Sequence, residues 1–342
     1  MRSMYASAYG ITLKVNGPTR THAEDSMGHH DIFQGWYERA GVRVSARRLF
    51  HDERDDGKWL FSPALLPHLE HEAVQAMPAS VRDALAARGL YEYMNRTAHL
   101  EAKVVNRTTH RIALDEAGFA VAGPIRMDAW KIYCDEAFHS LMSFDMVQQV
   151  ARETGIPDIP YSFDPVLDRL DAAKAELDRL RPGLGGLLQV VVFETLVTSI
   201  LGDVPRDRSV VTGVREVVAD HARDEARHHA FFALFFNRLW GALSVPDRAA
   251  AARVLPELVL ACLEPDLRMV KAALLASDVP PATAARIVAE SYPRQEVLAN
   301  MRRAARQTLR LFADHDAFDL PGVEESFTEA GLIVPERLHA AP

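Results

Sequence analysis

The sequence contains few cysteines and has no excess of positive charge. Two cysteines in 342 residues, Cys134 and Cys262, cannot form a disulfide framework, so we expect a reducing compartment, the cytoplasm. Eighteen glycines and 19 prolines are too few for a collagen or a flexible linker protein. The net charge of −8 gives no general attraction for nucleic acid or an anionic membrane, so neither is an expected partner.

Long hydrophobic runs are also missing. The most apolar stretch, residues 187–201, is shorter than the roughly 20 residues of a membrane-spanning helix and contains Glu194 near its middle. Residues 1–14 hold no sustained apolar segment, so we predict no secretory signal. Glycine-rich phosphate-binding loops are absent from the sequence, which argues against a nucleotide-binding α/β enzyme.

Helix-forming residues dominate the chain from residue 78 onward. Glycine and proline separate the helical stretches, and no alternating pattern predicts a substantial sheet. We therefore predict an all-α protein with a single domain, in which an irregular extension, residues 1–77, packs on a helical part, residues 78–342. The expected helices span 78–90, 94–119, 127–154, 163–181, 184–202, 208–244, 246–276 and 291–314.

An internal repeat contains the candidate chemistry. Residues 135–139 are DEAFH and residues 224–228 are DEARH, so both copies of Asp-Glu-x-x-His lie in predicted helices. Residues three apart share a helix face, so the glutamate and histidine of each copy point the same way. A single Glu-x-x-His is typical of a solvent-exposed helix face, but two copies indicate a helix bundle that binds two metal ions. Such a bundle also needs one glutamate from each of two further helices. The repeat supplies the candidate ligands Glu136, His139, Glu225 and His228.

Two lone glutamates complete that set. Glu194 has apolar residues on nearly every side, where an unpaired carboxylate is costly; a buried arginine partner or a neutral carboxyl is the alternative to a metal. Glu101 lies on the expected helix before the first motif. It has fewer apolar neighbours in the sequence than Glu194, so a position on the protein surface is its alternative. The order along the chain is lone glutamate, motif, lone glutamate, motif, which predicts two helix pairs related by a pseudo-repeat.

A third histidine lies on the same face as the second motif. His221, Glu225 and His228 fall at i, i+4 and i+7 of one helix, so His221 is a candidate seventh ligand. Its alternative is a position on the surface or behind the ligands. Four carboxylates balance the charge of two divalent ions. Carboxylate and imidazole donors without thiolate suit iron or manganese.

Each Glu-x-x-His is preceded by an aspartate. A metal-bound histidine usually donates its second N–H to a carboxylate or a carbonyl. In a pseudo-symmetric bundle each aspartate reaches the histidine of the opposite motif, so we expect Asp135 to contact His228 and Asp224 to contact His139. A solvent-facing position is the alternative for both aspartates.

Together these residues resemble the ferritin-like di-iron N-oxygenases typified by p-aminobenzoate N-oxygenase. His221, one turn before the second Glu-x-x-His, separates that family from ribonucleotide reductase small subunits, desaturases and multicomponent monooxygenases. The resemblance covers roughly residues 90–315 and implies a ferritin-like four-helix di-iron bundle with additional flanking helices. It implies the metal ligands Glu101, Glu136, His139, Glu194, His221, Glu225 and His228.

The resemblance also implies an activity and its partners. O₂ is the co-substrate, an aryl amine is oxidised to hydroxylamine, nitroso and nitro products, and such products belong to secondary-metabolite or antibiotic biosynthesis. The two iron ions need electrons from an external donor, a reductase or a ferredoxin. The resemblance further suggests a homodimer.

The resemblance gives less about the substrate pocket. Family members use an arginine of the C-terminal region to hold a substrate carboxylate, and Arg302 lies on an apolar line of the last expected helix; a protein carboxylate is its alternative partner. Tyr93, two turns before Glu101, is a candidate second donor, with a core or surface tyrosine as the alternative. Ile200 stands where the resemblance implies a polar pocket residue, which argues against plain p-aminobenzoate as the substrate.

Other functions share these ligands. C–H hydroxylation and desaturation use the same O₂ activation, so placement of the substrate decides among the reaction classes. A non-catalytic iron-storing bundle fits less well because a ferritin subunit is far shorter and Glu194 indicates a closed, dry site. A helical interaction protein without metal is the remaining alternative, and metal analysis separates it from the others.

Overall fold

A computed structural model describes residues 32–334, without the side chains of residues 198–200. From Phe33 onward the described residues belong to one compact unit that contains helices and helical turns, with an isolated bridge between Trp59 and Val210 in place of any strand. The prediction of an all-α fold is confirmed. Every helix of the described part is too short or too polar to cross a membrane.

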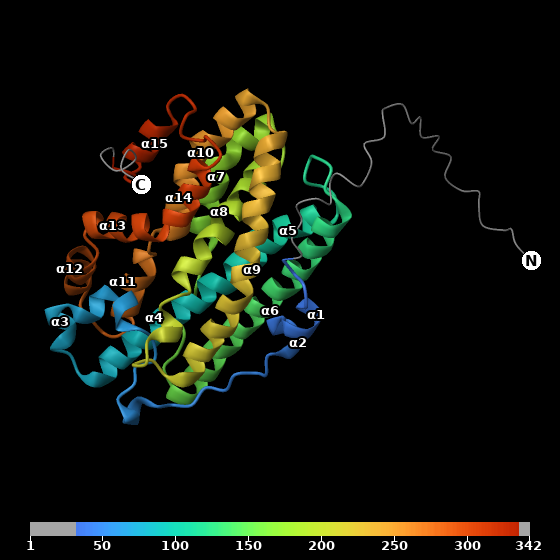
Figure 1. Cartoon of the computed structure of the whole chain (residues 1–342). Coiled ribbons are helices and arrows are strands. Elements are labelled where there is room, and N and C mark those ends of the chain that lie inside the picture. The colour runs from blue at the N-terminus through green and yellow to red at the C-terminus, as the bar shows by residue number, and fades with distance from the viewer. Residues whose placement is uncertain (1–31, 335–342) are drawn as a thin grey trace, which may run out of the picture. The chain divides into compact units, whose positions relative to one another are not determined.

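Long helices from four parts of the chain lie alongside one another and hold the candidate site. These segments are α4 (Ala79–Leu100), the π-helical turn η4 (Glu101–Val105), α5 (Asn106–Ala113), α6 (Gly123–Thr154), α8 (Leu184–Ile200) and α9 (Thr212–Ala242). Figure 1 shows their arrangement: α4 and α5 pack on α6, α8 packs on α9, and α6 packs on α9. The two predicted helix pairs are therefore present and in contact.

Helix α8 lies in the interior of this group. Every residue from Leu187 to Leu196 is buried, and α7 (Asp164–Leu180) and α10 (Val245–Leu263) pack on it from outside. A helix that is hydrophobic on all sides is stable only when it is covered on all sides. This burial places Glu194 in the core.

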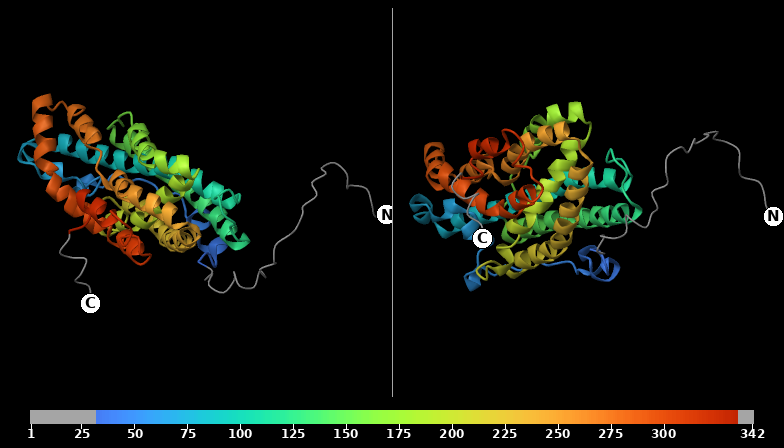
Figure 2. Two further views of the ribbon diagram at one scale, coloured as in Figure 1. Left: turned by 90° about the horizontal axis from the view of Figure 1, so that it is seen from above. Right: turned by 45° about the horizontal axis from the view of Figure 1, so that its top comes forward.

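The C-terminal helices flank one end of the long helices. They are α11 (Leu267–Leu275), α12 (Pro281–Ser291), α13 (Arg294–Ala304), α14 (Arg306–Ala313) and α15 (Val323–Glu329). In both views of Figure 2 the orange helices of this group lie beside the cyan start of α4, and α11 packs directly on α4. Their presence agrees with the additional flanking helices that the resemblance implies, although the helices expected from the sequence include only the parts that correspond to α11, α13 and α14.

The described part of the N-terminal extension contains more regular structure than expected. Its short elements are α1 (Trp36–Arg39), α2 (Gly41–Val44), η1 (Arg54–Asp56), η2 (Pro63–Leu65), η3 (Pro67–Glu70) and α3 (Glu72–Gln75). A further short turn of this kind, η5 (Val204–Arg206), lies outside the extension, between α8 and α9. Helix α2 contacts both α6 and α9, so this region reaches the two helices that contain the repeated motif. Residues 1–31 lie outside the described part.

Four of the expected helices are divided or joined in the structure. The expected helix 246–276 is divided into α10 and α11, because Pro265 forces the preceding Glu264 out of the helical conformation. The expected helix 291–314 is divided into α13 and α14 at Ala305. The expected helices 78–90 and 94–119 form one continuous helical run from α4 through η4 to α5, which ends at Ala113. Helices α12 and α15 were not predicted.

Candidate metal centre

The structure brings all seven candidate ligands into one buried cluster. Their atoms form two groups, and within each group the potential ligand atoms lie within 4.8 Å of one another. Glu136 and Glu225 belong to both groups, which is the arrangement expected of carboxylates between two metal ions. The first group also contains Glu101, His139 and His221, and the second also contains Glu194 and His228.

The two shared glutamates lie between the repeated histidines. Nδ1 of His228 is 2.7 Å from Glu136 Oε1 and 3.2 Å from Glu225 Oε1. Nδ1 of His139 is 3.0 Å from Glu136 Oε2 and 3.3 Å from Glu225 Oε1. Both histidines therefore present the same ring nitrogen to the same pair of carboxylates, as the pseudo-repeat requires.

Two ligands reach the cluster by features outside the repeat. Glu101 is 3% exposed and opens the π-helical turn η4, which adds a residue to the helical turn and is a feature common at functional sites. His221 is 4% exposed, and its Nε2 lies 3.1 Å from Glu225 Oε1 and 3.4 Å from Glu101 Oε1. The alternative of a surface position does not hold for either residue.

The electrostatics of the cluster favour bound cations. Burial, followed by repulsion from Glu136, raises the pKa of Glu101 well above its usual range, and burial with repulsion from Glu225 does the same for Glu194. Burial would lower the pKa of His228, but Glu225 and Glu136 raise it well above its usual value. Without added positive charge, the cluster therefore retains protons on groups that would otherwise be metal ligands.

Two buried carboxylate oxygens without a hydrogen-bond partner among the described residues indicate that the cluster suits bound metal ions. Glu194 Oε2 and Glu225 Oε2 are shielded from solvent and accept no hydrogen bond within the described part of the chain. A buried carboxylate oxygen without a partner is costly, and coordination to a cation removes that cost. Because the donors are carboxylates and imidazoles, the cluster fits a di-iron site.

Both aspartates make the crossed contacts that the pseudo-repeat predicts. Asp135 Oδ2 is 3.2 Å from His228 Nε2, and Asp224 Oδ2 is 3.4 Å from His139 Nε2. The two carboxylates are buried, so the solvent-facing alternative does not hold. Each aspartate thus holds the ring nitrogen that faces away from the cluster and leaves Nδ1 free to bind a metal.

A small cavity of about 70 Å³ adjoins the cluster. Glu101 and Glu194 line it together with Tyr93, Arg96 and Cys262. The Tyr93 hydroxyl is buried without a hydrogen-bond partner in the described part, and burial raises its pKa, so it remains a proton donor. The guanidinium of Arg96 donates through Nη2 to the Cys262 carbonyl at 2.8 Å, and its Nη1 lies 4.0 Å from Glu92 Oε1. This cavity is the candidate substrate pocket.

Arg96 lines this cavity, whereas Arg302, the arginine expected to hold an acidic substituent, does not. Arg302 lies on α13, donates through Nη1 to the Gly331 carbonyl at 2.8 Å and is not among the residues that line the cavity. The expected helix face that would combine Arg302 with apolar residues on both sides is not continuous, because α13 ends before Ala305. One signal for Arg96 was present in the sequence: it follows Tyr93 by three residues and therefore shares its helix face. The side chain of Ile200 lies outside the described residues.

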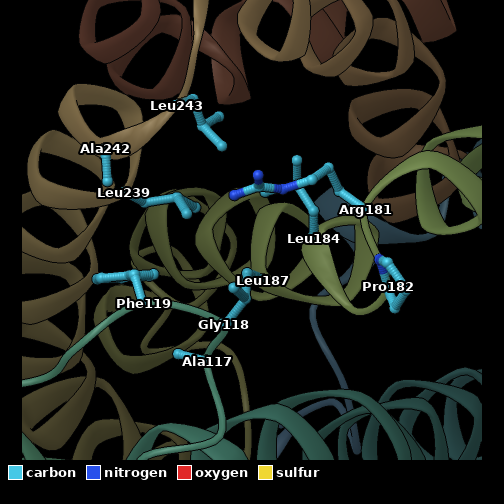
Figure 3. Close-up of a pocket in the computed structure, with 10 residues that line it drawn as sticks. All are labelled: Ala117, Gly118, Phe119, Arg181, Pro182, Leu184, Leu187, Leu239, Ala242 and Leu243. Carbon is cyan, nitrogen blue, oxygen red and sulfur yellow. The ribbon is translucent and has the colours of Figure 1, made fainter.

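A second cavity of about 230 Å³ has none of the lining residues of the first. Figure 3 shows the ten residues that line it. Leucines of α8 and α9, among them Leu184 and Leu239, form its apolar wall, and Arg181 reaches into it. Arg181 also lies 3.5 Å from Asp247, so its charge is partly balanced. This cavity contains none of the seven candidate ligands, so it is not the reaction pocket.

Replacing His221 by alanine tests its place in the ligand set. We expect the protein to fold, to bind iron at least about 10-fold more weakly and to show an altered visible spectrum when loaded with ferric iron, because one imidazole is lost. His229→Ala is the matched control, since this neighbouring residue belongs to neither ligand group. An iron titration and spectrum identical to those of the wild type would remove His221 from the set.

Comparison with known proteins agrees with this chemistry. A family model described as P-aminobenzoate N-oxygenase AurF matches residues 31–316, which is most of the chain. The match begins well before residue 90 and includes α1 and α2. No curated protein matches the chain.

Proposed function

Because the chain belongs to the p-aminobenzoate N-oxygenase family and is a di-iron N-oxygenase, we propose that it acts on an aryl amine. We propose further that this small molecule carries an acidic substituent. The observation that supports the substrate most directly is the cavity beside the cluster. The residues that line it include Glu101 and Glu194 of the cluster together with Tyr93 and Arg96.

The proposed ligand set follows the two groups of atoms. Glu101, His139 and His221 would hold one iron, Glu194 and His228 would hold the other, and Glu136 and Glu225 belong to both groups of ligand atoms. When bound and reduced, the two irons activate O₂. Manganese suits the same donors, so metal analysis includes it. The proposed ligands are therefore Glu101, Glu136, His139, Glu194, His221, Glu225 and His228.

The residues of the cavity orient the substrate. Arg96 attracts an acidic group by charge, and the Tyr93 hydroxyl is free to donate a hydrogen bond to the same group. An aryl amine held in this way directs its nitrogen toward Glu101 and Glu194. A cavity of about 70 Å³ is smaller than the ~150 Å³ cavity that accommodates benzene, so binding requires the lining side chains to move apart.

Electron balance requires an external donor. Converting R–NH₂ and O₂ to R–NHOH and water consumes two electrons and two protons. Further oxidation gives the nitroso and nitro products that we propose for this enzyme. We propose a ferredoxin or a reductase as the electron donor and secondary-metabolite biosynthesis as the setting. The two free cysteines, Cys134 and Cys262, favour a reducing compartment such as the cytoplasm.

Metal analysis and a product panel test this function together. Anaerobically loaded protein should bind about two irons per chain, and after chemical reduction it should convert aryl amines in air to hydroxylamine, nitroso or nitro compounds. Mass spectrometry with ¹⁸O₂ identifies where the oxygen is added. One tightly bound zinc would contradict the metal centre. Exclusive ring or chain hydroxylation across the panel would favour the C–H hydroxylase instead.

An exposed apolar stripe on α6 supports the proposal of a homodimer. Met127, Trp130, Leu141 and Phe144 are 52%, 38%, 61% and 54% exposed. Together with exposed Cys134 and Ala137 they follow alternating spacings of three and four residues, which are the a and d positions of a heptad repeat. A stripe of this kind fits the same stripe of a second copy, because a two-fold dimer buries one surface against itself.

Charged substitutions on this stripe should separate the subunits. We expect the double variant Leu141→Glu with Phe144→Glu to sediment as a monomer while the wild type sediments as a dimer, because four charges would face an apolar partner. Leu180→Glu on α7 is the matched control, since Leu180 is 59% exposed but lies outside the stripe. A wild-type monomer at micromolar concentration would contradict the proposal.

A further inference from the structure

The two short helices α1 and α2 touch the outer side of the metal centre. The indole nitrogen of Trp36 donates to Asp135 Oδ2 at 2.8 Å. The backbone N–H of Gly41 donates to Asp224 at 3.0 Å to Oδ2 and 3.3 Å to Oδ1. Phe33, just before α1, stacks on the His228 ring with the ring centres 6.1 Å apart. A segment of nine residues thus contacts both aspartates and one candidate ligand.

Each contact continues inward to a different histidine. Asp135 lies against Nε2 of His228, and Asp224 lies against Nε2 of His139. Both histidines turn their other nitrogen, Nδ1, toward the shared glutamates. The orientation of each imidazole therefore depends on an aspartate that is itself held by a donor from α1 or α2.

We propose that α1 and α2 act as a clamp on the metal centre, in which Trp36 and Gly41 are positioning residues. Trp36 holds Asp135 on His228, and Gly41 holds Asp224 on His139. The clamp fixes both imidazoles in the orientation that presents Nδ1 to the metals. This inference rests on the ligand set proposed above.

The space around Gly41 supports this role. A Cβ atom at this position would lie 2.4 Å from Asp224 Oδ2, closer than real Cβ contacts occur. Gly41 does not have a positive φ, so backbone strain is not the reason for glycine. The absence of a side chain lets the backbone N–H approach the carboxylate, and an added methyl group would displace Asp224 from His139.

The two aspartates depend on the clamp to different degrees. Asp224 also contacts Arg227 within its own helix, so Gly41 is not its sole donor. Asp135 Oδ1 is buried and has no hydrogen-bond partner in the described part, which leaves Trp36 and His228 as the donors to this carboxylate there. Loss of the indole N–H therefore weakens the hold on Asp135 more than any other single change in α1.

Two pairs of matched variants test the clamp. Trp36→Phe keeps an aromatic ring but removes the donor, and Tyr37→Phe is its control because Tyr37 is 59% exposed. Gly41→Ala introduces the clash with Asp224, and Gly123→Ala is its control because a Cβ there meets nothing within 4 Å. Asp135→Asn serves as a reference, since it removes the charge next to His228 directly.

Cobalt binding gives a readout that does not depend on turnover. In anaerobic titrations with Co²⁺, we expect Trp36→Phe and Gly41→Ala to bind 10- to 100-fold more weakly than wild type. We also expect Trp36→Phe to shift the visible cobalt bands in the same direction as Asp135→Asn. Both control variants should match the wild type. Thermal unfolding of the metal-free proteins checks that each variant folds. If Trp36→Phe or Gly41→Ala does not fold, the remaining one of these two variants tests the clamp.

The outcomes separate this inference from the ligand set on which it rests. A wild-type protein that binds no cobalt would contradict the ligand set itself. A wild type that binds two ions, with folded Trp36→Phe and Gly41→Ala variants that match it in affinity and spectrum, would overturn the clamp alone.

Discussion

Replacing Glu194 by leucine is expected to reduce bound iron from about two ions per chain to fewer than one and to abolish turnover. Burial and the negative charges of Glu225 and Glu136 raise the pKa of Glu194, so cations beside this carboxyl favour its ionised form. Removing it takes away one charge and one ligand of the second group. Iron analysis after anaerobic loading and gel filtration measures the effect.

The stability of the metal-free protein should respond in the opposite sense. Glu194 is 2% exposed in an apolar helix, and replacing a buried ionisable group by an apolar one is often neutral or stabilising by about 1–4 kcal/mol. We therefore expect an unchanged or higher melting temperature for the metal-free variant. Glu194→Gln should also lose iron without that gain. Glu176→Leu on the exposed face of α7 is the control, and full iron loading of Glu194→Leu would show that the ligand assignment is wrong.

Replacing Arg96 by glutamine should weaken binding of an aminobenzoate 10- to 150-fold. A charge-assisted hydrogen bond contributes roughly 1.5–3 kcal/mol, which corresponds to that range. A neutral amine such as aniline should change by less than about threefold, because it makes no such bond. Glutamine retains a donor for the Cys262 carbonyl, so the end of α10 stays capped. Calorimetric titration of the oxidised, iron-loaded protein measures both affinities.

Arg302→Gln is the matched control for this experiment. Its guanidinium donates to the Gly331 carbonyl outside the cavity, so we expect both amines to bind as they do to the wild type. Selective loss of aminobenzoate binding in Arg302→Gln, with Arg96→Gln unaffected, would support the role of Arg302 that the sequence suggested. Equal loss of both amines in Arg96→Gln would mean that Arg96 has a structural role only.

The sequence by itself indicated which residues form the cluster. Helical periodicity places each glutamate and histidine of the repeat on one face, and the doubled motif indicates a pair of such helices. The apolar surroundings of Glu194 predicted its burial, because a helix that is hydrophobic on all sides belongs in a core. The crossed contacts of Asp135 and Asp224 followed from the same pseudo-repeat. These inferences depend on the spacing of residues along a single helix, which can be read from the sequence.

Helix ends were less predictable than helix interiors. Pro265 ends α10, yet the surrounding residues are good helix formers, so the composition alone suggested one helix where there are two. The π-helical turn at Glu101 has no composition signal, and it exists where the long helical run passes the cluster. Packing against neighbouring helices decides such features, since their local free-energy cost is small.

Tertiary structure decided which residues meet Tyr93, Glu101 and Glu194 in the cavity, and it decided the contacts of α1 and α2. Arg96 and Cys262 line one cavity although 166 positions separate them, because α4 and the end of α10 meet beside the cluster. Trp36 and Gly41 reach Asp135 and Asp224 across 99 and 183 positions. Spacing along one helix determines which side chains share a face, but only the packing of separate helices determines which faces meet.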